Sequence, residues 1–238
     1  YIDTDSLFFS ALPLIQKNNK SVDVTNHDIM VDLTLKECEK FQDYINTSLN
    51  MFAKRMINID EHRFVFKQEV VAPNGIFISK KRYSLWIIDS EGMRVDELLV
   101  KGIDIVRSNF PKSFKTLLTE VVTGLLKGKT KDDIDNIVIS FKRNMKQEPI
   151  VDIAMSTGIK QIKKFLGPGN KSVKGTPAHV QSAINYNSML KDIDADDQYT
   201  KVVGGDKIKW VYLKTNPYGI NKVAFKNTDN PDKIMEFV

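Results

Sequence analysis

The chain begins with Tyr1-Ile2-Asp3-Thr4-Asp5-Ser6, and the apolar run Leu7-Phe8-Phe9 follows directly. This pattern predicts an acidic hairpin tip that leads into a buried strand. Because residues i and i+2 of a strand face the same side, Asp3 and Asp5 can converge on one cation. Hard carboxylate oxygens suit Mg²⁺, which binds one or two carboxylates together with substrate phosphates. A polar turn with two solvated aspartates is the alternative, and a lone D-x-D pair fits it well.

The composition is that of a folded, moderately basic chain. Its 238 residues allow one large domain or two small ones, and an apolar content of 42% supports a real core. A net charge of +5 with a pI near 9.0 permits nucleic-acid binding without requiring it. Cys38 is the single cysteine, which excludes an internal disulfide and fits a reducing compartment. We find no run of 18 apolar residues and no basic segment before the first apolar stretch, so neither a transmembrane helix nor a signal peptide is expected.

Hydrophobic periodicity predicts an α+β fold. The apolar run after the acidic tip predicts a strand over 7–14, ended by Pro13, and a polar loop over 16–28. Apolar residues three and four apart predict a long helix over 34–56, with Thr34 as N-cap and Glu37 in capping-box register. The expected later elements are strands at 63–72, 76–88 (two pieces) and 100–106, helices at 112–127, 132–146 and 176–190, a turn at 89–92, a basic loop at 160–174, and strands at 207–213 and 222–226.

A second informative stretch is Lys80-Lys81-Arg82-Tyr83. Three cations between apolar residues interrupt an expected strand, which is costly unless an anionic partner lies alongside. Strand alternation would place Lys81 and Tyr83 on one face, with Lys80 and Arg82 on the other. A solvated basic end of a strand is the alternative.

These stretches carry a resemblance to one family. The string Y-x-D-T-D-S resembles the C-motif of B-family DNA-directed DNA polymerases, in which the acidic turn holds the catalytic metals. K-K-R-Y resembles the K-x-Y motif with which those enzymes hold the primer–template. Residues 101–107 resemble the K-G-x-E/D-x-V-R segment that leads from palm to thumb, with Asp104 in place of the more usual Glu. Residues 175–187 and 216–219 resemble thumb segments of the T-even-phage type.

The resemblance implies a domain organisation. Residues 1–108 would be the C-terminal part of a palm, with antiparallel strands and one long helix. Residues 109–238 would be a mostly helical thumb, incomplete at its C-terminus, with a small late β-hairpin. The remaining palm carboxylate motif, the fingers and the exonuclease domain should precede Tyr1, so the chain alone is expected to be inactive. The phage type implies the cytoplasm of a virus-infected bacterium.

The resemblance also implies roles for residues. Asp3 and Asp5 would be catalytic metal ligands, with Asp5 as the principal ligand and Glu69 as an auxiliary one, and Thr4 would contact the nucleotide. Two Mg²⁺ ions in the complete enzyme would activate the primer 3′-hydroxyl and neutralise the leaving pyrophosphate of the dNTP. The residues expected to bind DNA are Lys80, Lys81, Arg82, Tyr83, Asp104, Arg107 and His179.

The implied partners are primer–template DNA, a dNTP, the N-terminal portion of the polymerase and a sliding clamp, with no membrane. Two other hypotheses stay open at this point. One is a non-catalytic duplex-binding module, or a subunit of a split polymerase, with a vestigial acidic turn. The other is a generic α+β domain with chance motifs.

Overall fold

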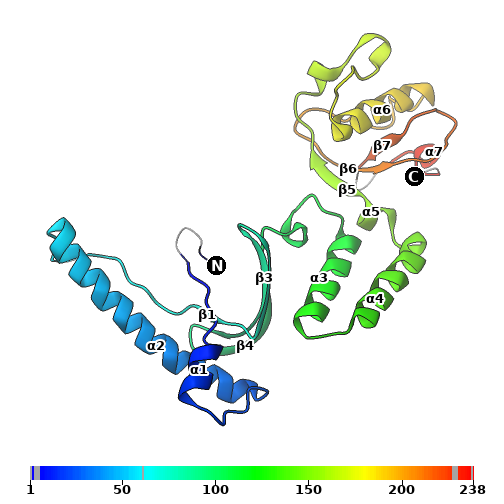
Figure 1. The fold of residues 1–238 in the computed structure, drawn as a ribbon. Helices are drawn as coiled ribbons and strands as arrows, with labels where there is room; N and C mark the ends of the chain where they lie inside the picture. Colours follow the sequence, from blue (N-terminus) through cyan, green and yellow to red (C-terminus); the bar gives the residue numbers. More distant parts are fainter. Residues whose placement is uncertain (1, 3–5, 61, 227–229, 237) are drawn as a thin grey trace. The chain divides into compact units, whose positions relative to one another are not determined.

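The computed structural model describes residues 2, 6–60, 62–226, 230–236 and 238. These residues form two compact units, which Figure 1 shows in one ribbon. The first unit comprises Tyr1–Ile103 and Val122–Thr130, and the second comprises Asp104–Val121 and Lys131–Val238. Both units combine helices with antiparallel sheets, so the expected α+β class is confirmed. The assignment of 1–108 to a palm and 109–238 to a thumb stays a prediction.

The beginning of the first unit is helical where a strand was predicted. Leu7 pairs with Ile2 in an isolated antiparallel bridge, and the chain then enters α1 (Leu12–Asn18). The predicted strand over 7–14 is therefore wrong. Pro13 lies in the first turn of α1, where the missing N–H of proline costs no hydrogen bond.

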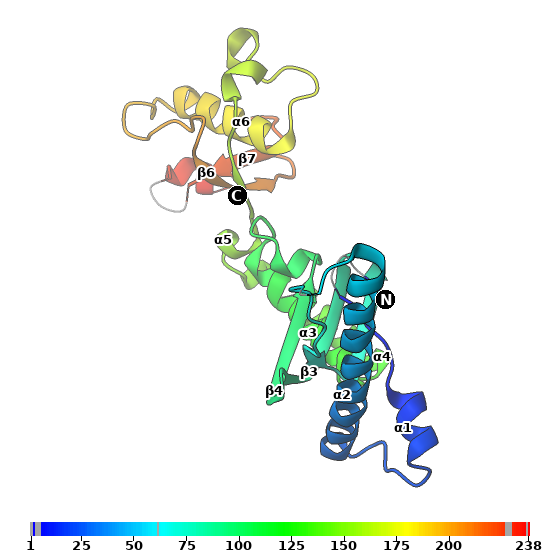
Figure 2. The same cartoon turned by 90° about the vertical axis from the view of Figure 1, so that its left-hand side faces the viewer.

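The long helix α2 (His27–Phe52) starts before the predicted cap. The side chain of Asn26 accepts a hydrogen bond from the Ile29 N–H and is the true N-cap. Thr34 lies inside the helix, where its Oγ1 donates to the Met30 carbonyl at 2.6 Å. The predicted cap at Thr34 is therefore wrong. The predicted loop over 16–28 is wrong at its two ends, where α1 and α2 extend into it. Figure 2 shows α1 beside the N-terminal half of α2.

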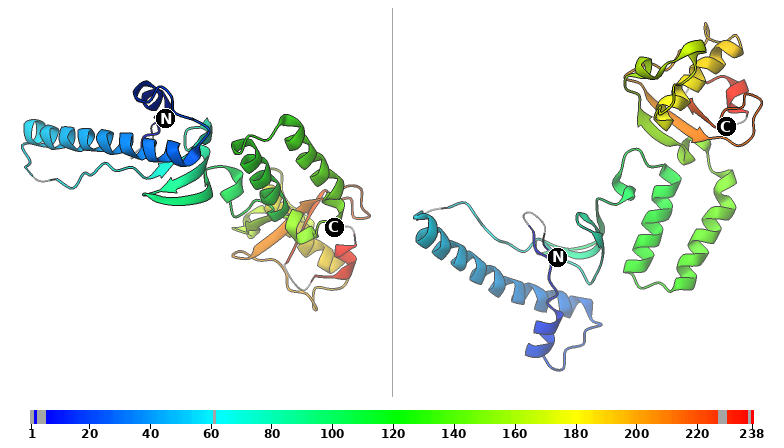
Figure 3. Two further views of the ribbon diagram at one scale, coloured as in Figure 1. Left: turned by 90° about the horizontal axis from the view of Figure 1, so that it is seen from below. Right: turned by 45° about the horizontal axis from the view of Figure 1, so that its top comes forward.

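Beyond α2, a π-helical turn (Ala53–Ile57) ends at Asn58, and the chain returns without regular structure. The far end of α2 and this returning segment extend away from the sheet (Figure 3). The predicted strand over 63–72 is reduced to β1 (Val70–Val71). The backbone of Phe66 forms its hydrogen bonds with a side chain and not with a strand. The Asn46 amide donates to the Phe66 carbonyl and accepts from the Phe66 N–H, both at 2.8 Å.

The sheet of the first unit is antiparallel and centred on β3. One side of β3 pairs with β4, and the other pairs with β1 and β2 in succession. The two strand pieces predicted here are confirmed, and the turn predicted at 89–92 is confirmed at Glu91 and Gly92, whereas Asp89 and Ser90 lie in β3. The strand predicted at 100–106 is confirmed only at 100–101, because β4 ends before Gly102 (φ +64°) and a 3₁₀ turn (Asp104–Val106) follows. The bounds are β2 (Asn74–Ser79), β3 (Arg82–Ser90) and β4 (Met93–Lys101).

The core of the first unit is small. Tyr83, Leu85 and Ile87 alternate along β3 and are buried on one face of the sheet. Asp89 follows them and is fully buried. It forms an ion pair with Arg94 at 3.0 Å, and Arg94 also bonds Asp32 of α2 at 2.6 Å.

The sequence predicts the next two helices well, and residues 122–126 of the first of them are counted with the first unit. Helix α3 (Lys112–Leu126) and α4 (Lys131–Asn144) match the predicted ranges 112–127 and 132–146 within two residues at each end. The Phe114 and Phe141 rings pack edge to face at 5.2 Å, which joins the start of α3 to the end of α4. A short helix, α5 (Ile150–Ile153), was not predicted.

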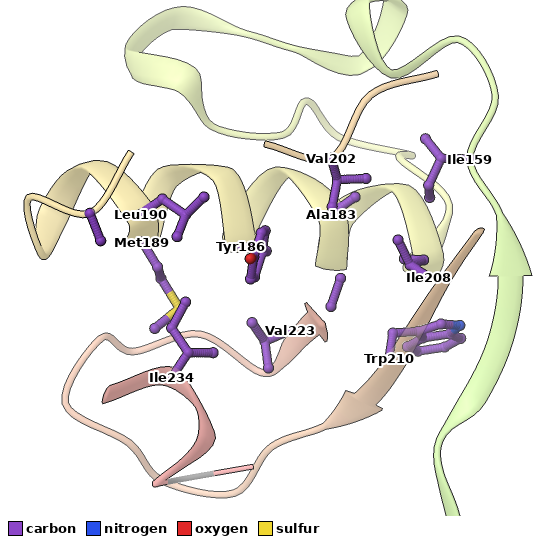
Figure 4. Close-up of a cluster of buried hydrophobic side chains, with 12 residues drawn as sticks. Ile159, Ala183, Tyr186, Met189, Leu190, Val202, Ile208, Trp210, Val223 and Ile234 are labelled. Atoms are coloured by element: carbon purple, nitrogen blue, oxygen red, sulfur yellow. The ribbon is translucent and has the colours of Figure 1, made fainter. Parts of the chain in front are cut away.

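The rest of the second unit is one helix on a three-stranded sheet with the order β5-β6-β7. The predicted late strands and the helix near 176–190 are confirmed, whereas β5 and α7 were missed. Figure 4 shows the apolar core between α6 and the sheet, in which Tyr186, Leu190 and Val223 are fully buried. The bounds are β5 (Met155–Gly158), α6 (Ala178–Asp192), β6 (Lys207–Tyr212), β7 (Lys222–Phe225) and α7 (Asp232–Met235).

Candidate functional site

The basic stretch at 80–83 forms a turn and the start of a strand. Ser79 pairs with Arg82, so Lys80 and Lys81 alone connect β2 to β3. Both lysines are exposed, and Lys81 has a left-handed backbone (φ 61°). The predicted placement of these lysines on opposite faces of a strand is wrong, because neither lies on a strand. A two-residue hairpin turn therefore places both lysines at the end of the sheet.

Gly102, the residue directly after β4, lies close against the backbone of this turn. A Cβ atom at Gly102 would lie 2.1 Å from the Lys81 carbonyl oxygen, so a side chain there would collide with the backbone of the turn. Tyr83 pairs with Lys101 one residue away. The K-K-R-Y stretch and the K-G segment, which are separated in the sequence, therefore meet at one end of the sheet.

An aromatic cluster joins the same end of the sheet to the start of the chain. The Phe8 ring lies 5.3 Å from Tyr83 and 5.7 Å from Phe77, and Phe77 stacks on Tyr83 at 5.6 Å. These contacts leave Tyr83 only 8% exposed. Phe8 therefore anchors the segment that directly follows the acidic residues beside the Lys80–Lys81 turn.

The acidic residues themselves, Asp3 and Asp5, and the neighbouring Thr4 lie outside the described residues. The described neighbours Ile2 and Leu7 pair with each other, and Phe8 packs as above. The chemistry of this donor set fits Mg²⁺, because two carboxylates offer hard oxygen ligands. The roles of Asp3, Thr4 and Asp5 stay predictions.

Glu69 lies at the other end of β3. Its carbonyl accepts a hydrogen bond from the Glu91 N–H at 2.8 Å, beside the β3–β4 turn. Eight residue steps of β3 separate that turn from Lys81, which is roughly 25 Å for an extended strand. The structure does not bring Glu69 to the Lys80–Lys81 turn, and its role as a metal ligand stays a prediction. Across the part of the chain that the structure describes, no three His, Cys, Asp or Glu side chains are grouped as a metal site.

Three of the residues predicted to bind DNA lie in the second unit. Asp104 and Arg107 form an ion pair with each other at 3.1 Å in the 3₁₀ turn and just after it. His179 lies in the first turn of α6, where its carbonyl accepts a hydrogen bond from Ser182. Burial lowers the pKa of His179, which favours the neutral imidazole.

Sequence reasoning missed the residues that assemble this region. Phe8 and Phe77 were read only as parts of apolar runs, and Gly102 only as part of a motif. The signal available for Gly102 was a glycine directly after a strand, which marks positive φ or a close backbone approach. A groove of about 550 Å³ between α3 and α4, lined by Ser113, Glu148 and Asp152 among others, contains none of the predicted site residues.

Among the described residues, no helix has the length and apolar character needed to span a membrane. A comparison with family models matches residues 1–235 to DNA polymerase family B. A search of curated proteins found no match.

Proposed function

Because the chain belongs to DNA polymerase family B, we propose that it supplies the C-terminal palm and the thumb of a replicative polymerase of the T-even-phage type. Membership makes it part of a DNA-directed DNA polymerase, a nucleotidyltransferase of DNA replication. The observation that carries the finer proposal is the contact of Gly102 with the Lys81 carbonyl, because it brings two of the resembling motifs together. Action in the cytoplasm of an infected bacterium, with a sliding clamp as partner, belongs to the same proposal and rests on the resemblance of 175–187 and 216–219.

In this proposal the Lys80–Lys81 turn binds the primer–template near the primer end. Both lysines are exposed, Ser79 pairs with Arg82 across their turn, and Gly102 lies close against the turn backbone. Minor-groove acceptors are nearly the same for all base pairs, so cations at this position can hold a duplex of any sequence. Phosphate contacts from the same side chains add affinity that declines with salt.

Asp3 and Asp5 would hold the catalytic Mg²⁺, with Asp5 as the principal ligand. When bound, the metal lowers the pKa of the primer hydroxyl and neutralises charge on the leaving pyrophosphate of the dNTP. Phe8 lies three residues after Asp5, so at most roughly 11 Å of chain separates Asp5 from the residue that packs against Tyr83. The rest of the sequence carries no second acidic motif of the family, so extension requires a further polypeptide segment that brings the remaining carboxylate.

A non-catalytic duplex-binding module is the second candidate. The observation that favours it is the position of Glu69, which hydrogen-bonds beside the β3–β4 turn, at the end of β3 remote from Lys81. In this case the Lys80–Lys81 turn would bind DNA in the same way, and the acidic segment would have no metal-dependent role.

DNA binding tests what both candidates share. The double variant Lys80→Ala/Lys81→Ala should raise the Kd of the full chain for a fluorescein-labelled primer–template about tenfold at 100 mM KCl. The slope of log K against log salt should fall by up to about two, because each phosphate contact contributes about 0.9. The matched control is Lys17→Ala/Lys36→Ala, which removes the same charge from exposed positions of α1 and α2. Equal Kd values and slopes for the two variants would contradict the proposal.

Metal binding separates the two candidates. We expect the chain with primer–template to bind Mn²⁺, used as a paramagnetic stand-in for Mg²⁺, and to lose that binding in Asp3→Asn/Asp5→Asn. An electron paramagnetic resonance titration measures it. Binding that does not change in the variant favours the non-catalytic module. Primer extension by the chain alone with Mg²⁺ and dNTPs should give no product, and extension that disappears in Asp5→Asn would overturn the expected inactivity.

A further inference from the structure

The groove between α3 and α4 lies within the second unit and is formed by one side of each helix. Its helical lining residues lie between Lys112 and Glu120 on α3 and between Asn136 and Asn144 on α4. On each helix they recur four residues apart, which places them on one side of that helix. The groove therefore follows both helices (Figure 1) over eight residue steps, about 12 Å at 1.5 Å per residue. Its volume of about 550 Å³ is within the range of specific binding sites, about 300–1,000 Å³.

The apolar residues of the groove are incompletely covered. Leu117, Ile137 and Phe141 line it, and all three are only half-buried. All 14 residues of α4 are described, and none of them is buried. The apolar stripe of an amphipathic helix normally faces a core. The described part of the chain therefore leaves room against α4 for a further apolar element.

The charged residues of the groove are mainly acidic. Glu120 is exposed, and no cation pairs with it among the described residues. Glu148 accepts a hydrogen bond from the buried Ser113 hydroxyl at 2.5 Å, and Lys112 pairs with Asp152 at 3.2 Å. Three carboxylates and one ammonium group give the lining a net charge of −2. The groove should therefore attract a basic partner.

A second copy of this chain does not fit the groove electrostatically. In a two-fold symmetric contact the same surface faces itself, so Glu120 and Glu148 of one copy would approach the same acidic groups of the other. Like charges across an interface are unfavourable. The net charge of the lining thus favours a different protein over self-association.

The shape of the groove favours a helix as its occupant. Ser113, Thr116 and Ser140 are short side chains among the lining residues, so another backbone can come close to α3 and α4. The length of the groove matches about two turns of a docked helix, whose anchoring side chains would be spaced three or four residues apart.

We propose that the α3–α4 groove binds an amphipathic helix of a second protein. The apolar face of that helix contacts Leu117, Ile137 and Phe141, and its Lys or Arg side chains pair with Glu120 and Glu148. The groove contains no residue assigned to DNA or metal binding, so the inference goes beyond the proposed function. It gives this part of the polymerase a site that recruits another protein.

Binding of a synthetic helix by the full chain tests the proposal. The probe is a fluorescein-labelled peptide of about 18 residues, because shorter isolated helices are mostly unfolded in water. Leucines three and four residues apart form one face of the peptide, and lysines flank them. One control peptide has glutamate in place of lysine, and a second has the same composition without helical spacing. In fluorescence anisotropy at 100 mM KCl, the lysine peptide should bind at least about tenfold more tightly than either control.

Two isoleucines of α4 provide a matched pair of variants. Ile137 lines the groove, whereas Ile139 is 51% exposed and does not line it. Ile137→Glu should raise the Kd of the lysine peptide at least about tenfold, because it places a carboxylate under the apolar face of the bound helix. Ile139→Glu adds the same charge and should change this Kd less than about twofold. Ser140→Phe fills the groove from an exposed position and should weaken binding to a similar degree as Ile137→Glu.

Circular dichroism of each variant verifies that the fold is retained. Ser140→Phe keeps the test decisive where Ile137→Glu fails to fold, because the exposed Ser140 is not part of a core.

Charge reversal tests the acidic character of the groove. Glu120→Lys should raise the Kd of the lysine peptide about fivefold and lower that of the glutamate peptide. Asp197→Lys makes the same change of charge at an exposed position of the same unit, outside the groove. Because salt at 100 mM screens charges over about 10 Å, this control should alter either Kd less than about twofold.

Three outcomes would overturn the inference. The first is an equal Kd for Ile137→Glu and Ile139→Glu, or no saturable binding of the lysine peptide by the wild-type chain. The second is equal binding of the lysine and glutamate peptides. The third is a dimer in sedimentation velocity that is lost in Ile137→Glu and retained in Ile139→Glu, which would assign the groove to a second copy. Affinity for primer–template DNA should be the same in these two variants, so the proposed function and this inference fail independently.

Discussion

Helix α2 of the first unit and helix α6 of the second differ in how much of their surface is buried. Helix α2 has 26 residues, all described, and Val31 is its single buried residue. Helix α6 has 15 residues and buries seven of them, including Tyr186 and Leu190. The second unit therefore has a self-sufficient apolar core, whereas the unit with the acidic segment and the Lys80–Lys81 turn depends on a thin one.

In the first unit, polar contacts stabilise the structure in addition to its small apolar core. The Asn46 side chain holds Phe66, and the Gln42 side chain accepts from the Gln68 N–H at 3.0 Å. Arg94 links the buried Asp89 to α2. A hydrogen bond forms only when both partners are present in the right geometry. Removal of one partner therefore leaves the other polar group unsatisfied. The two units should therefore respond to different kinds of substitution.

The largest expected difference is between core leucines. Leu190→Ala in the second unit should reduce the free energy of unfolding by about 4 kcal/mol, and Leu85→Ala in the first by about 2–3 kcal/mol, because the smaller core can relax around the cavity. The chain contains two tryptophans, Trp86 in the first unit and Trp210 in the second. Urea unfolding followed by fluorescence in Trp210→Phe and Trp86→Phe backgrounds reports each unit separately. Equal losses of free energy in the two variants would contradict a difference between the two cores.

The next effect concerns the buried carboxylate of the first unit. Asp89→Ala removes the partner of Arg94 and of the Gly92 N–H, and should cost about 2–3 kcal/mol in the transition reported by Trp86. Asp32→Ala is the matched control. Asp32 is 74% exposed, so losing its bond to Arg94 should cost less than about 1 kcal/mol. Equal free energies of unfolding for Asp89→Ala and Asp32→Ala would show that the buried Asp89 contacts do not stabilise this unit.

A smaller effect distinguishes two glycines with positive φ. Gly102→Ala should cost at least about 2 kcal/mol, because left-handed strain adds to the collision with the Lys81 carbonyl. Gly92→Ala has the strain alone, since nothing lies within 4 Å of a Cβ there, and should cost about 1 kcal/mol. Gly102→Ala should also weaken binding to primer–template DNA, whereas Gly92→Ala should not. Unchanged DNA affinity in Gly102→Ala would show that the turn does not need this support.

The smallest effect is a pH dependence in the second unit. Burial lowers the pKa of His179 in the folded protein, so the unfolded chain binds this proton more readily. Its contribution to stability is complete above the unfolded pKa of 6.5 and is lost as the pH falls toward the folded value. The melting temperature reported by Trp210 should therefore decrease from pH 7.5 to 5.5, and less so in His179→Gln. The same slope in both proteins would exclude His179 as the cause.

The sequence predicts elements best where local chemistry decides the structure. The turn predicted at 89–92 is found at Glu91 and Gly92, where both residues have positive φ and Gly92 has φ 85°. Helices α3 and α4 were predicted because their apolar spacing is regular. Pro13 was misread, because a proline marks the first turn of a helix as readily as the end of a strand.

Elements held by distant partners were not predictable in this way. Phe64 and Phe66 alternate like a strand, yet Phe64 is 73% exposed and amide side chains of α2 bond the backbone around it. The candidate site shows the same limit. Lys80 and Lys81 are not turn-forming residues by type, and their turn packs closely against Gly102, the residue directly after β4.

The two ends of β3 have a consequence for the evolution of this protein. Gly102 fixes Lys81 at one end, and Arg94 fixes Asp89 at the other. Side chains alternate between the faces of a strand, so a gain or loss of one residue between these points would turn buried positions outward. Relatives can vary the amino acids of this strand, but insertions and deletions within it should be rare.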